Sequence, residues 1–343
     1  IQTGFYGERL DGLLRAKNNH LTGIINGNNT EEFNPATDTR ISATYTADDM
    51  KPKAENKRAL QEQLGLEIRD DVPIVGIVSR LSSQKGLDLV DYVISDIMKE
   101  NLQLVVLGMG DSRYINLLNW AEQNYPGRVA ARYSMDHDLA HRIYAGSDIF
   151  LMPSQFEPCG LSQMISMIYG TIPVVRETGG LRDTVLSYNE YTGEGNGFSF
   201  LNYNAHDMLN TLQRALSYYA DHPEIWEKLM ERGMRGDYTW KHSAELYIAL
   251  YEKLLTPPLL LSYPHSATVA EGKEKEKASS VNSESKAANP VTEVDAIKKA
   301  AKKPAPKKPA AKKPVVKAAA KKTPADKSDA KSAGAGRKKK TDI

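Results

Sequence analysis

Short apolar runs alternate with helical patterns between Pro73 and Phe200. Amphipathic stretches, such as GLDLVDYVISDIMKE (86–100) and HDLAHRIYAGS (137–147), separate the runs. Apolar runs of four to seven residues, rich in Val and Ile and separated by helices, are typical of βαβ units that build a parallel sheet. The pattern therefore predicts a doubly wound α/β domain, in which ligands bind at the carboxyl ends of the strands. The predicted strands are PIVGIVS (73–79), LQLVVLG (102–108), VAARY (129–133), DIFLMP (148–153), IPVV (172–175) and GFSF (197–200).

The regions that flank this alternation have other patterns. Residues 205–255 place apolar and aromatic side chains at helical spacing, which predicts helices that pack on the domain core. Residues 53–66, KAENKRALQEQLGL, predict a charged helix that ends at a glycine C-cap. Residues 23–38 are rich in Asn, Gly and Pro and predict a loop.

Charge is distributed unevenly along the chain. Residues 271–343 contain 21 Lys and Arg against 9 Asp and Glu, whereas residues 1–270 contain 24 against 34. Residues 297–343 repeat KKPA and AKKP units without an aromatic residue. They have too little apolar surface to offset the entropy of ordering, so we expect a disordered tail. Two interpretations of this tail stay open: weak binding of a polyanion such as nucleic acid, or a solvated and dispensable extension.

Several classes of protein do not fit the sequence. The single cysteine, Cys159, rules out an internal disulfide framework and favours a reducing, cytoplasmic location. No apolar run approaches the roughly 18 residues of a membrane helix, and the N-terminus lacks the layout of a signal peptide. His137 and His141 are four residues apart without an adjacent Glu, so they are interpreted as surface or packing residues, and no metal site is predicted. The first strand is followed by neither a P-loop nor a G-x-G-x-x-G motif, which argues against a nucleoside triphosphatase or an ordinary dinucleotide enzyme.

Three strand-to-helix junctions contain candidate ligand-binding residues. In the first, GIVSRLSSQKGLDLV (76–90), Arg80 and Lys85 lie between a strand and a helix that Gly86 opens. Two cations beside a helix N-terminus suit a multiply charged anion such as a diphosphate, although a pair of exposed loop charges would give the same pattern. In the second, ETGGLRDTV (177–185), Thr178, Gly179 and Gly180 would let backbone N–H groups approach a ligand closely.

The third junction is SQFEPCGLSQ (154–163). Glu157 follows an apolar strand, Pro158 fixes the turn, and Gly160 permits a tight entry into the next helix. A carboxylate in this position could be a helix cap that the helix dipole stabilises by about 0.3–1 kcal/mol. Because the other two junctions point into the same crevice, a ligand-binding role is preferred for Glu157. Cys159 as a thiolate nucleophile would need a base that the sequence does not identify.

Taken together, these residues resemble the bacterial glycogen synthases and plant starch synthases, which are glycosyltransferases of the GT-B type with two Rossmann-like domains. The matching text covers roughly residues 4–255. Its segments are YGERLDGLLR (6–15), GIINGNN (23–29), NPATD (34–38), AENKRALQEQLGL (54–66), VSRLSSQKGLDLV (78–90), LVVLGMGD (104–111), AHRIYAGSDIFLMPSQFEPCGLSQMISMIYGTIPVVRETGGLRDTV (140–185) and NGFSF (196–200).

The resemblance implies a function and an arrangement of domains. The family transfers glucose from a nucleotide-diphosphate glucose, here expected to be ADP-glucose, to the non-reducing end of an α-1,4-glucan, with retention of configuration and no required metal or other cofactor. Residues 1–70 would then end the N-terminal catalytic domain and link the domains, residues 71–255 would form the donor-binding Rossmann-like domain, and residues 256–343 would be the tail. The chain starts with Ile and lacks the family's acceptor-binding half, so we expect it to be partial.

The resemblance also implies roles for single residues. Arg80 and Lys85 match the basic pair on the donor diphosphate, and Glu157 matches the acidic residue that contacts the donor glucose; these three are the candidate catalytic residues. The candidate donor-binding residues are Met135, Cys159, Gly160, Leu161, Ser162, Thr178, Gly179 and Gly180.

Two positions depart from the patterns of related transferases. Ile165 stands where many of them have a second glutamate, and Met135 stands where some have a tyrosine that stacks on adenine, with Tyr133 two residues earlier. The preference between ADP-glucose and UDP-glucose is therefore left open. Another retaining hexosyltransferase of the same architecture, or a non-catalytic fragment that binds sugar nucleotides, are the alternatives.

Overall fold

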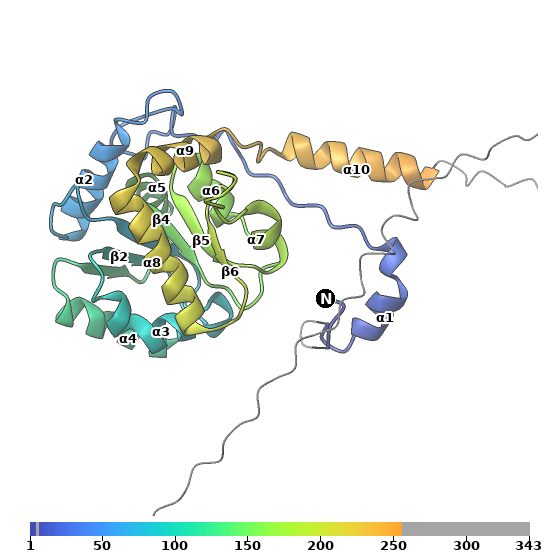
Figure 1. The fold of residues 1–343 in the computed structure, drawn as a ribbon, viewed down its shortest axis with the longest axis horizontal. Coiled ribbons are helices and arrows are strands. Elements are labelled where there is room, and N and C mark those ends of the chain that lie inside the picture. Colours follow the sequence, from blue (N-terminus) through green and yellow to red (C-terminus); the bar gives the residue numbers. More distant parts are fainter. Residues whose placement is uncertain (5–6, 256–343) are drawn as a thin grey trace, which may run out of the picture. The chain divides into compact units, whose positions relative to one another are not determined.

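The computed structural model describes residues 1–4 and 7–255. A six-stranded sheet with the order β3-β2-β1-β4-β5-β6 lies at its centre, and every neighbouring pair of strands is parallel (Figure 1). The predicted doubly wound sheet is therefore confirmed, and each strand ends within one residue of its expected bounds. The strands are β1 (Ile74–Val78), β2 (Gln103–Leu107), β3 (Val129–Arg132), β4 (Ile149–Met152), β5 (Ile172–Arg176) and β6 (Phe198–Phe200).

Helices cover both faces of the sheet (Figure 1). Alternate side chains of one strand point to opposite faces. Accordingly, Val75 and Ile77 of β1 pack into the core beneath α3, α4, α8 and α9, whereas Ile74 packs beneath α2 and α5. The domain helices are α2 (Lys53–Leu64), α3 (Leu87–Ile97), α4 (Ser112–Asn124), α5 (His137–Gly146), α6 (Ser162–Ile168), α7 (Gly179–Thr184), α8 (Ala205–Asp221) and α9 (Pro223–Met234).

The outer segments contain the remaining helices of the described residues. These are α1 (Asp11–Ala16), the 3-10 turn η1 (Asn18–His20) and α10 (Trp240–Leu255). The predicted helices of residues 205–255 are confirmed as α8, α9 and α10, although only Ser243 is buried in α10, so this last helix does not pack on the core as expected. The predicted end of α2 is confirmed as well, because Gly65 follows it in the left-handed conformation with φ 73°. The predictions for residues 256–343 lie outside the described residues, and the division at residue 70 stays a prediction.

A buried polar cluster attaches the loop of residues 33–40 to the domain. The Asp38 cluster consists of Asp38, His141 and Tyr169. Asp38 Oδ2 accepts hydrogen bonds from the Tyr169 hydroxyl (2.6 Å) and from Nδ1 of His141 (2.7 Å), and its side chain is fully buried. The His141 ring also stacks on Phe33, with ring centroids 4.6 Å apart. The prediction that His141 is a packing residue is confirmed, and His137 is exposed.

A second buried cluster joins the start of α2 to the amino-terminal end of the sheet. Lys57 Nζ lies 2.9 Å from the carboxylate of Asp148 and 2.9 Å from the Tyr219 hydroxyl. Lys53 Nζ donates to the carbonyl oxygen of Ala145 (2.7 Å) and to Thr171 Oγ1 (2.9 Å). Burial lowers the pKa of Lys53 to about 7, and the nearby positive charge of Lys57 acts in the same direction.

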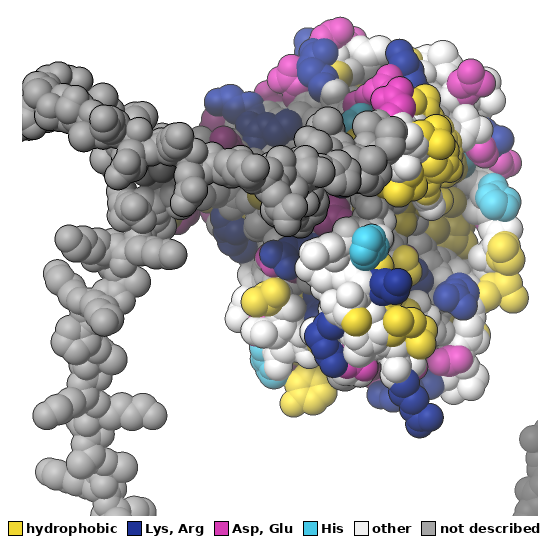
Figure 2. Space-filling view, turned by 90° about the vertical axis from the view of Figure 1, so that its right-hand side faces the viewer, with side chains coloured by type: hydrophobic (Ala, Val, Ile, Leu, Met, Phe, Trp, Pro, Cys, Tyr) yellow, Lys and Arg dark blue, Asp and Glu magenta, His cyan; other side chains and the backbone are white. Residues whose placement is uncertain are grey.

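The surface carries charges of both signs. Figure 2 shows Lys and Arg side chains interspersed with Asp and Glu side chains over the visible face, beside an area where hydrophobic side chains gather. None of the helices in the described part of the chain is both long and apolar enough to span a bilayer.

Candidate functional site

The strand order places the candidate residues around one crevice. Connections leave β1 in one direction, toward β2 and β3, and the chain then crosses back to β4, so β1 and β4 are neighbours at the point where the order reverses. In open parallel sheets this switch point, at the carboxyl ends of the strands, is where ligands bind. The loop after β1 contains Arg80 and Lys85, and the loop after β4 contains Glu157.

The loop after β1 folds into a short 3-10 turn, η2 (Ser83–Lys85), before α3 begins. Gly86 follows in the left-handed conformation, with φ 79°, and a Cβ atom there would clash with the carbonyl oxygen of Pro153. The backbone N–H of Gln155 donates to the carbonyl oxygen of Gln84 (2.9 Å). The loops after β1 and β4 are therefore joined backbone to backbone at the crevice.

Two candidate catalytic side chains meet across these loops. Lys85 Nζ lies 2.5 Å from Glu157 Oε2, and their side chains are 18% and 12% exposed. The Ser154 hydroxyl is a weaker partner of the same oxygen, at 3.4 Å. Arg80 is exposed, and its guanidinium forms no hydrogen bond or ion pair with the described residues. One cation at the crevice is thus balanced by a carboxylate, while the other is uncompensated.

The alternative role of Glu157 as a helix cap is wrong. β4 ends at Met152 and α6 begins at Ser162, so Glu157 lies in the middle of the connecting loop rather than at the end of the strand. The cap position of α6 belongs to Leu161, and no side chain caps this end. Lys85, and not the backbone of a helix, is therefore the partner that orients the Glu157 carboxylate.

The turn after β5 contacts the Glu157 loop directly. The N–H of Gly180 donates to the carbonyl oxygens of Glu157 (3.1 Å) and Pro158 (3.2 Å). A Cβ atom at Gly180 would overlap the carbonyl oxygen of Cys159, so only glycine permits this approach. Gly179 and Gly180 therefore lie against the backbone of the Glu157 loop, where the N–H of Gly180 is used by protein carbonyl oxygens; the expected approach of this turn to a ligand stays a prediction.

The other candidates lie in different surroundings around the crevice. Leu161 is exposed, Ser162 is half-buried, and Gly160 turns with φ 72° into α6. Burial raises the pKa of the half-buried Cys159 thiol, which disfavours a thiolate nucleophile. Met135 is 81% exposed in the turn before α5, and no hydrogen bond connects it with the loops that hold Lys85 and Glu157.

The two departures from the family pattern have structural consequences. Ile165 is buried in the core beneath α6, so its side chain does not face the crevice as an additional ligand group. The hydroxyl of Tyr133 donates to Asn119 of α4 (2.8 Å), and burial raises its pKa to about 12. Tyr133 is therefore held by α4, and Met135 is the exposed side chain of this turn.

Two residues that the sequence reading did not identify brace the site. The Tyr203 hydroxyl lies 2.5 Å from Asp88 Oδ1 and 2.9 Å from the carbonyl oxygen of Ser83, so it tethers the turn that ends in Lys85. Burial and the hydrogen bond with Asp88 raise the pKa of Tyr203. Arg176, at the end of β5, donates to the carbonyl oxygen of Gln155 (2.5 Å), and its guanidinium lies 5.5 Å from the centre of the Tyr203 ring. The one sequence signal for Tyr203 is its position three residues after β6, because residues that follow the strands of a parallel sheet lie near the binding edge.

The arrangement suits an anion with several negative charges and a polar neutral group. Lys85 and Arg80 supply the positive charge, and Glu157 supplies a hydrogen-bond acceptor beside them. Among the described residues, no group of three or more His, Cys, Asp and Glu side chains could hold a metal ion.

Comparison with known proteins gives the family of this site. Residues 61–230 match the family model described as "Glycosyl transferases group 1". Residues 61–230 form a group 1 glycosyltransferase domain. All three junctions of the crevice fall within this glycosyltransferase domain, and so do Arg176 and Tyr203.

Glycogen synthases are similar to the chain over a longer range. The chain is 57% identical to a glycogen synthase of Geobacillus thermodenitrificans over 255 residues, which are 74% of this chain and 52% of that protein. A glycogen synthase of Bacillus cereus is 54% identical over the same length and is covered to 53%. The chain thus spans about half the length of the curated relatives that it matches.

A solved structure supports the same relationship. The catalytic domain of starch synthase IV from Arabidopsis thaliana, bound to ADP and acarbose, superposes with a TM-score of 0.69 at 37% sequence identity. The match covers 74% of this chain and 52% of the other. The resemblance to glycogen and starch synthases is therefore confirmed, together with the glycosyltransferase fold.

Proposed function

We propose that this chain is the donor-binding part of a glycogen or starch synthase. The complete protein would transfer glucose from ADP-glucose to the non-reducing end of an α-1,4-glucan, with retention of configuration and without a metal, in the cytoplasm. The ADP and acarbose in the starch synthase IV structure support a donor nucleotide and a glucan-like acceptor in this family.

The contact between Lys85 and Glu157 is the observation that carries the proposal. The two side chains come from loops 72 residues apart and meet within 2.5 Å at the switch point of the sheet. Such a partly buried pair contributes little to folding by itself, because desolvation offsets much of the attraction between the charges. A site that binds a charged ligand explains why both groups are placed there.

The binding of a sugar nucleotide would redistribute the partners of this pair. The diphosphate would compete with Glu157 for Lys85 and would also engage Arg80, which has no partner in the described chain. Glu157 would then accept hydrogen bonds from the hydroxyl groups of the donor glucose. As the bond to the sugar breaks, negative charge grows on the departing nucleoside diphosphate, and cations that are already in place stabilise it.

Glu157 has two possible tasks in this mechanism. It could position the glucose ring through hydrogen bonds, or its negative charge could stabilise a sugar that becomes cationic in the transition state. A Glu157→Gln substitution separates the two, because glutamine keeps hydrogen-bonding capacity and loses the charge. A large loss of kcat at unchanged KM would support the electrostatic task.

The decisive experiment restores the missing half of the protein. The sequence that corresponds to the first half of the Geobacillus glycogen synthase would be joined to this chain, and the incorporation of labelled glucose into glycogen would be measured with ADP-glucose and with UDP-glucose. Transfer from ADP-glucose is the expected result. Transfer to another acceptor would support a different hexosyltransferase, and failure with both donors despite ADP binding would support a non-catalytic fragment.

A further inference from the structure

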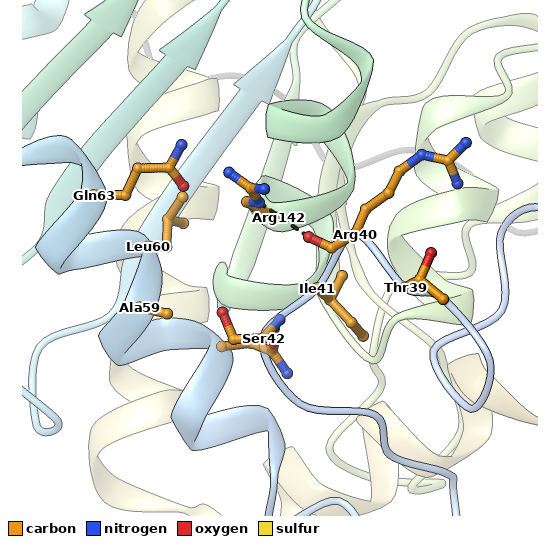
Figure 3. A pocket seen from close by; sticks show the side chains of 9 residues that line it. Thr39, Arg40, Ile41, Ser42, Ala59, Leu60, Gln63 and Arg142 are labelled. Atoms are coloured by element: carbon orange, nitrogen blue, oxygen red, sulfur yellow. Dashed lines mark hydrogen bonds between the residues drawn. The ribbon is translucent and has the colours of Figure 1, made fainter.

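A second polar cavity lies away from the crevice, between α2, α5 and the loop that precedes α2. Its volume is about 390 Å³, which is within the usual range of small-molecule pockets. Thr39, Arg40 and Ser42 line it on the loop side, and Ala59, Leu60 and Gln63 line it on α2 (Figure 3). None of the residues of the candidate donor site belongs to this lining.

Arg142 supplies the positive charge of this cavity. Its Nε atom donates to the carbonyl oxygen of Arg40 (2.9 Å), and the guanidinium projects from α5 toward Leu60 and Gln63 of α2 (Figure 3). This bond fixes the plane of the guanidinium. The two terminal nitrogens have no hydrogen-bond or ion-pair partner in the described chain, and so their donors remain available to a ligand.

The charge of Arg142 is not neutralised by the cavity wall. The lining contains two arginines and no carboxylate. Arg40 is turned away and forms an ion pair with Asp138 at 3.1 Å, which leaves Arg142 as the uncompensated cation of the lining. Residues 1–270 carry more acidic than basic side chains, so a positive cavity is not a general property of this surface.

The remaining lining suits a small polar molecule. The wall is fixed by Asn56, whose Oδ1 accepts hydrogen bonds from the N–H groups of Ser42 (2.9 Å) and Ala43 (3.2 Å). The Ser42 hydroxyl and the Gln63 amide belong to residues that line the space and form no hydrogen bond with the described residues, while Leu60 and Ile41 supply apolar contact. A guanidinium with two free nitrogens matches the paired oxygens of phosphate or carboxylate.

We propose that this cavity is a binding site for a small phosphate monoester, with the phosphate on Arg142 and the hydroxyl groups of the ligand against Ser42 and Gln63. The proposal does not depend on the proposed function, because the cavity shares no residue with the donor site. A phosphate group is preferred over a carboxylate because its third terminal oxygen can also accept a hydrogen bond from the Ser42 hydroxyl or the Gln63 amide.

Calorimetric titration of the full chain tests this site. The protein would carry both Arg80→Ala and Lys85→Ala throughout, so that phosphate bound at the donor crevice does not contribute. Inorganic phosphate, glycerol phosphate and acetate would be the probes. We expect saturable binding of both phosphates, tighter for glycerol phosphate, and an Arg142→Gln substitution should weaken it at least about tenfold, as the loss of a charged hydrogen-bond donor pair does.

The controls separate this site from general charge effects. Arg58→Gln removes the same charge from the exposed surface of α2, where Arg58 pairs with Glu62, and should leave the affinity within about twofold. Arg142→Lys keeps the positive charge but lacks the paired donors of the guanidinium, so it should weaken phosphate binding by an intermediate factor. If Arg142→Gln does not fold, the phosphate affinity of Arg142→Lys tests the proposal instead. Three results would each overturn the proposal: no saturable binding of phosphate, Arg142 variants that bind phosphate as tightly as the protein that keeps Arg142, or acetate that binds more tightly than the phosphates.

Discussion

Charged side chains occupy two contrasting surroundings in this domain. In the Asp38 cluster, the carboxylate is fully buried and accepts hydrogen bonds from Tyr169, His141 and the backbone of Arg40. At the crevice, Arg80 is exposed and has no partner among residues 1–4 and 7–255, and Lys85 and Glu157 have mainly each other. In the Asp38 cluster, hydrogen bonds within the protein satisfy the buried carboxylate. At the crevice, the charged groups can still form hydrogen bonds and ion pairs with a ligand. The number of internal partners thus distinguishes charges that hold the fold from charges that are available for binding.

Removal of the Asp38 charge should have the largest effect on stability. Asp38→Asn turns one of the two acceptor oxygens into an NH2 donor, which must then face either Tyr169 and His141 or the N–H of Arg40. Breaking such a buried polar network costs about 3–5 kcal/mol of unfolding free energy. Urea denaturation measures this loss. Asp138→Asn is the matched control, because its side chain is 64% exposed and its pair with Arg40 should contribute less than about 1 kcal/mol. If Asp38→Asn and Asp138→Asn lower the unfolding free energy by the same amount, buried and exposed carboxylates do not differ in their contribution to stability as we expect.

Removal of the Lys85 charge should instead affect function. In the chimera that joins this chain to the first half of the Geobacillus glycogen synthase, Lys85→Ala should lower turnover about a hundredfold or more, because the loss of one positioned donor costs about 2.7–4 kcal/mol in the barrier. ADP binding to the present chain should weaken as well. The control is Lys99→Ala, which removes an exposed cation that pairs with Asp96. Unchanged turnover in Lys85→Ala would remove this residue from the donor site.

The pH dependence of stability should report the buried Lys53. Its pKa falls from the ordinary value of 10.5 to about 7 on folding, so between these values the unfolded chain binds the additional proton. The unfolding free energy should therefore rise with pH, by about 2 kcal/mol between pH 7 and pH 9. Lys53→Met should remove this rise, because the titrating group is absent.

The control for Lys53 lies two residues earlier. Lys51 is exposed in the same segment, so Lys51→Met should keep the rise in stability. Chemical denaturation at several pH values measures both variants. If the unfolding free energy of Lys53→Met rises with pH as much as that of the unchanged protein, Lys53 keeps its proton in the folded protein. It would then be a buried charge satisfied by internal partners, as Asp38 is.

The smallest expected effect concerns the tether of the Lys85 turn. Tyr203→Phe removes the hydroxyl that contacts Asp88 and Ser83, which should cost about 1 kcal/mol of stability and weaken ADP binding several-fold. Tyr219→Phe removes a comparable hydroxyl that contacts Lys57, away from the crevice, and should lower stability alone. If both variants bind ADP with equal affinity, Tyr203 has a structural role only.

The sequence was sufficient for the sheet and for the grouping of the candidate residues. Strand positions follow from short apolar runs, and the carboxyl ends of parallel strands meet at one edge, which predicted that the three junctions would lie at one crevice. The turn beside Gly65 was predictable for a local reason, since a left-handed residue at the end of a helix favours glycine.

Other features depended on packing between distant segments. Asp38 and His141 are 103 residues apart, and Tyr203 and Asp88 are 115 apart, so no local pattern indicates that either pair forms. Side-chain partners of this kind follow from the tertiary structure, whereas strand patterns are present in the sequence.

The backbone contacts of the crevice limit how this domain can diversify. Gly86 and Gly180 lie against carbonyl oxygens of the loop between β4 and α6, so a side chain at either glycine, or a residue inserted beside it, would force the loops apart. Exposed side chains such as Met135 and Leu161 carry no such restriction. Natural variation and laboratory selection of new donor preferences should therefore accumulate at these exposed positions, while the lengths of the surrounding loops stay constant.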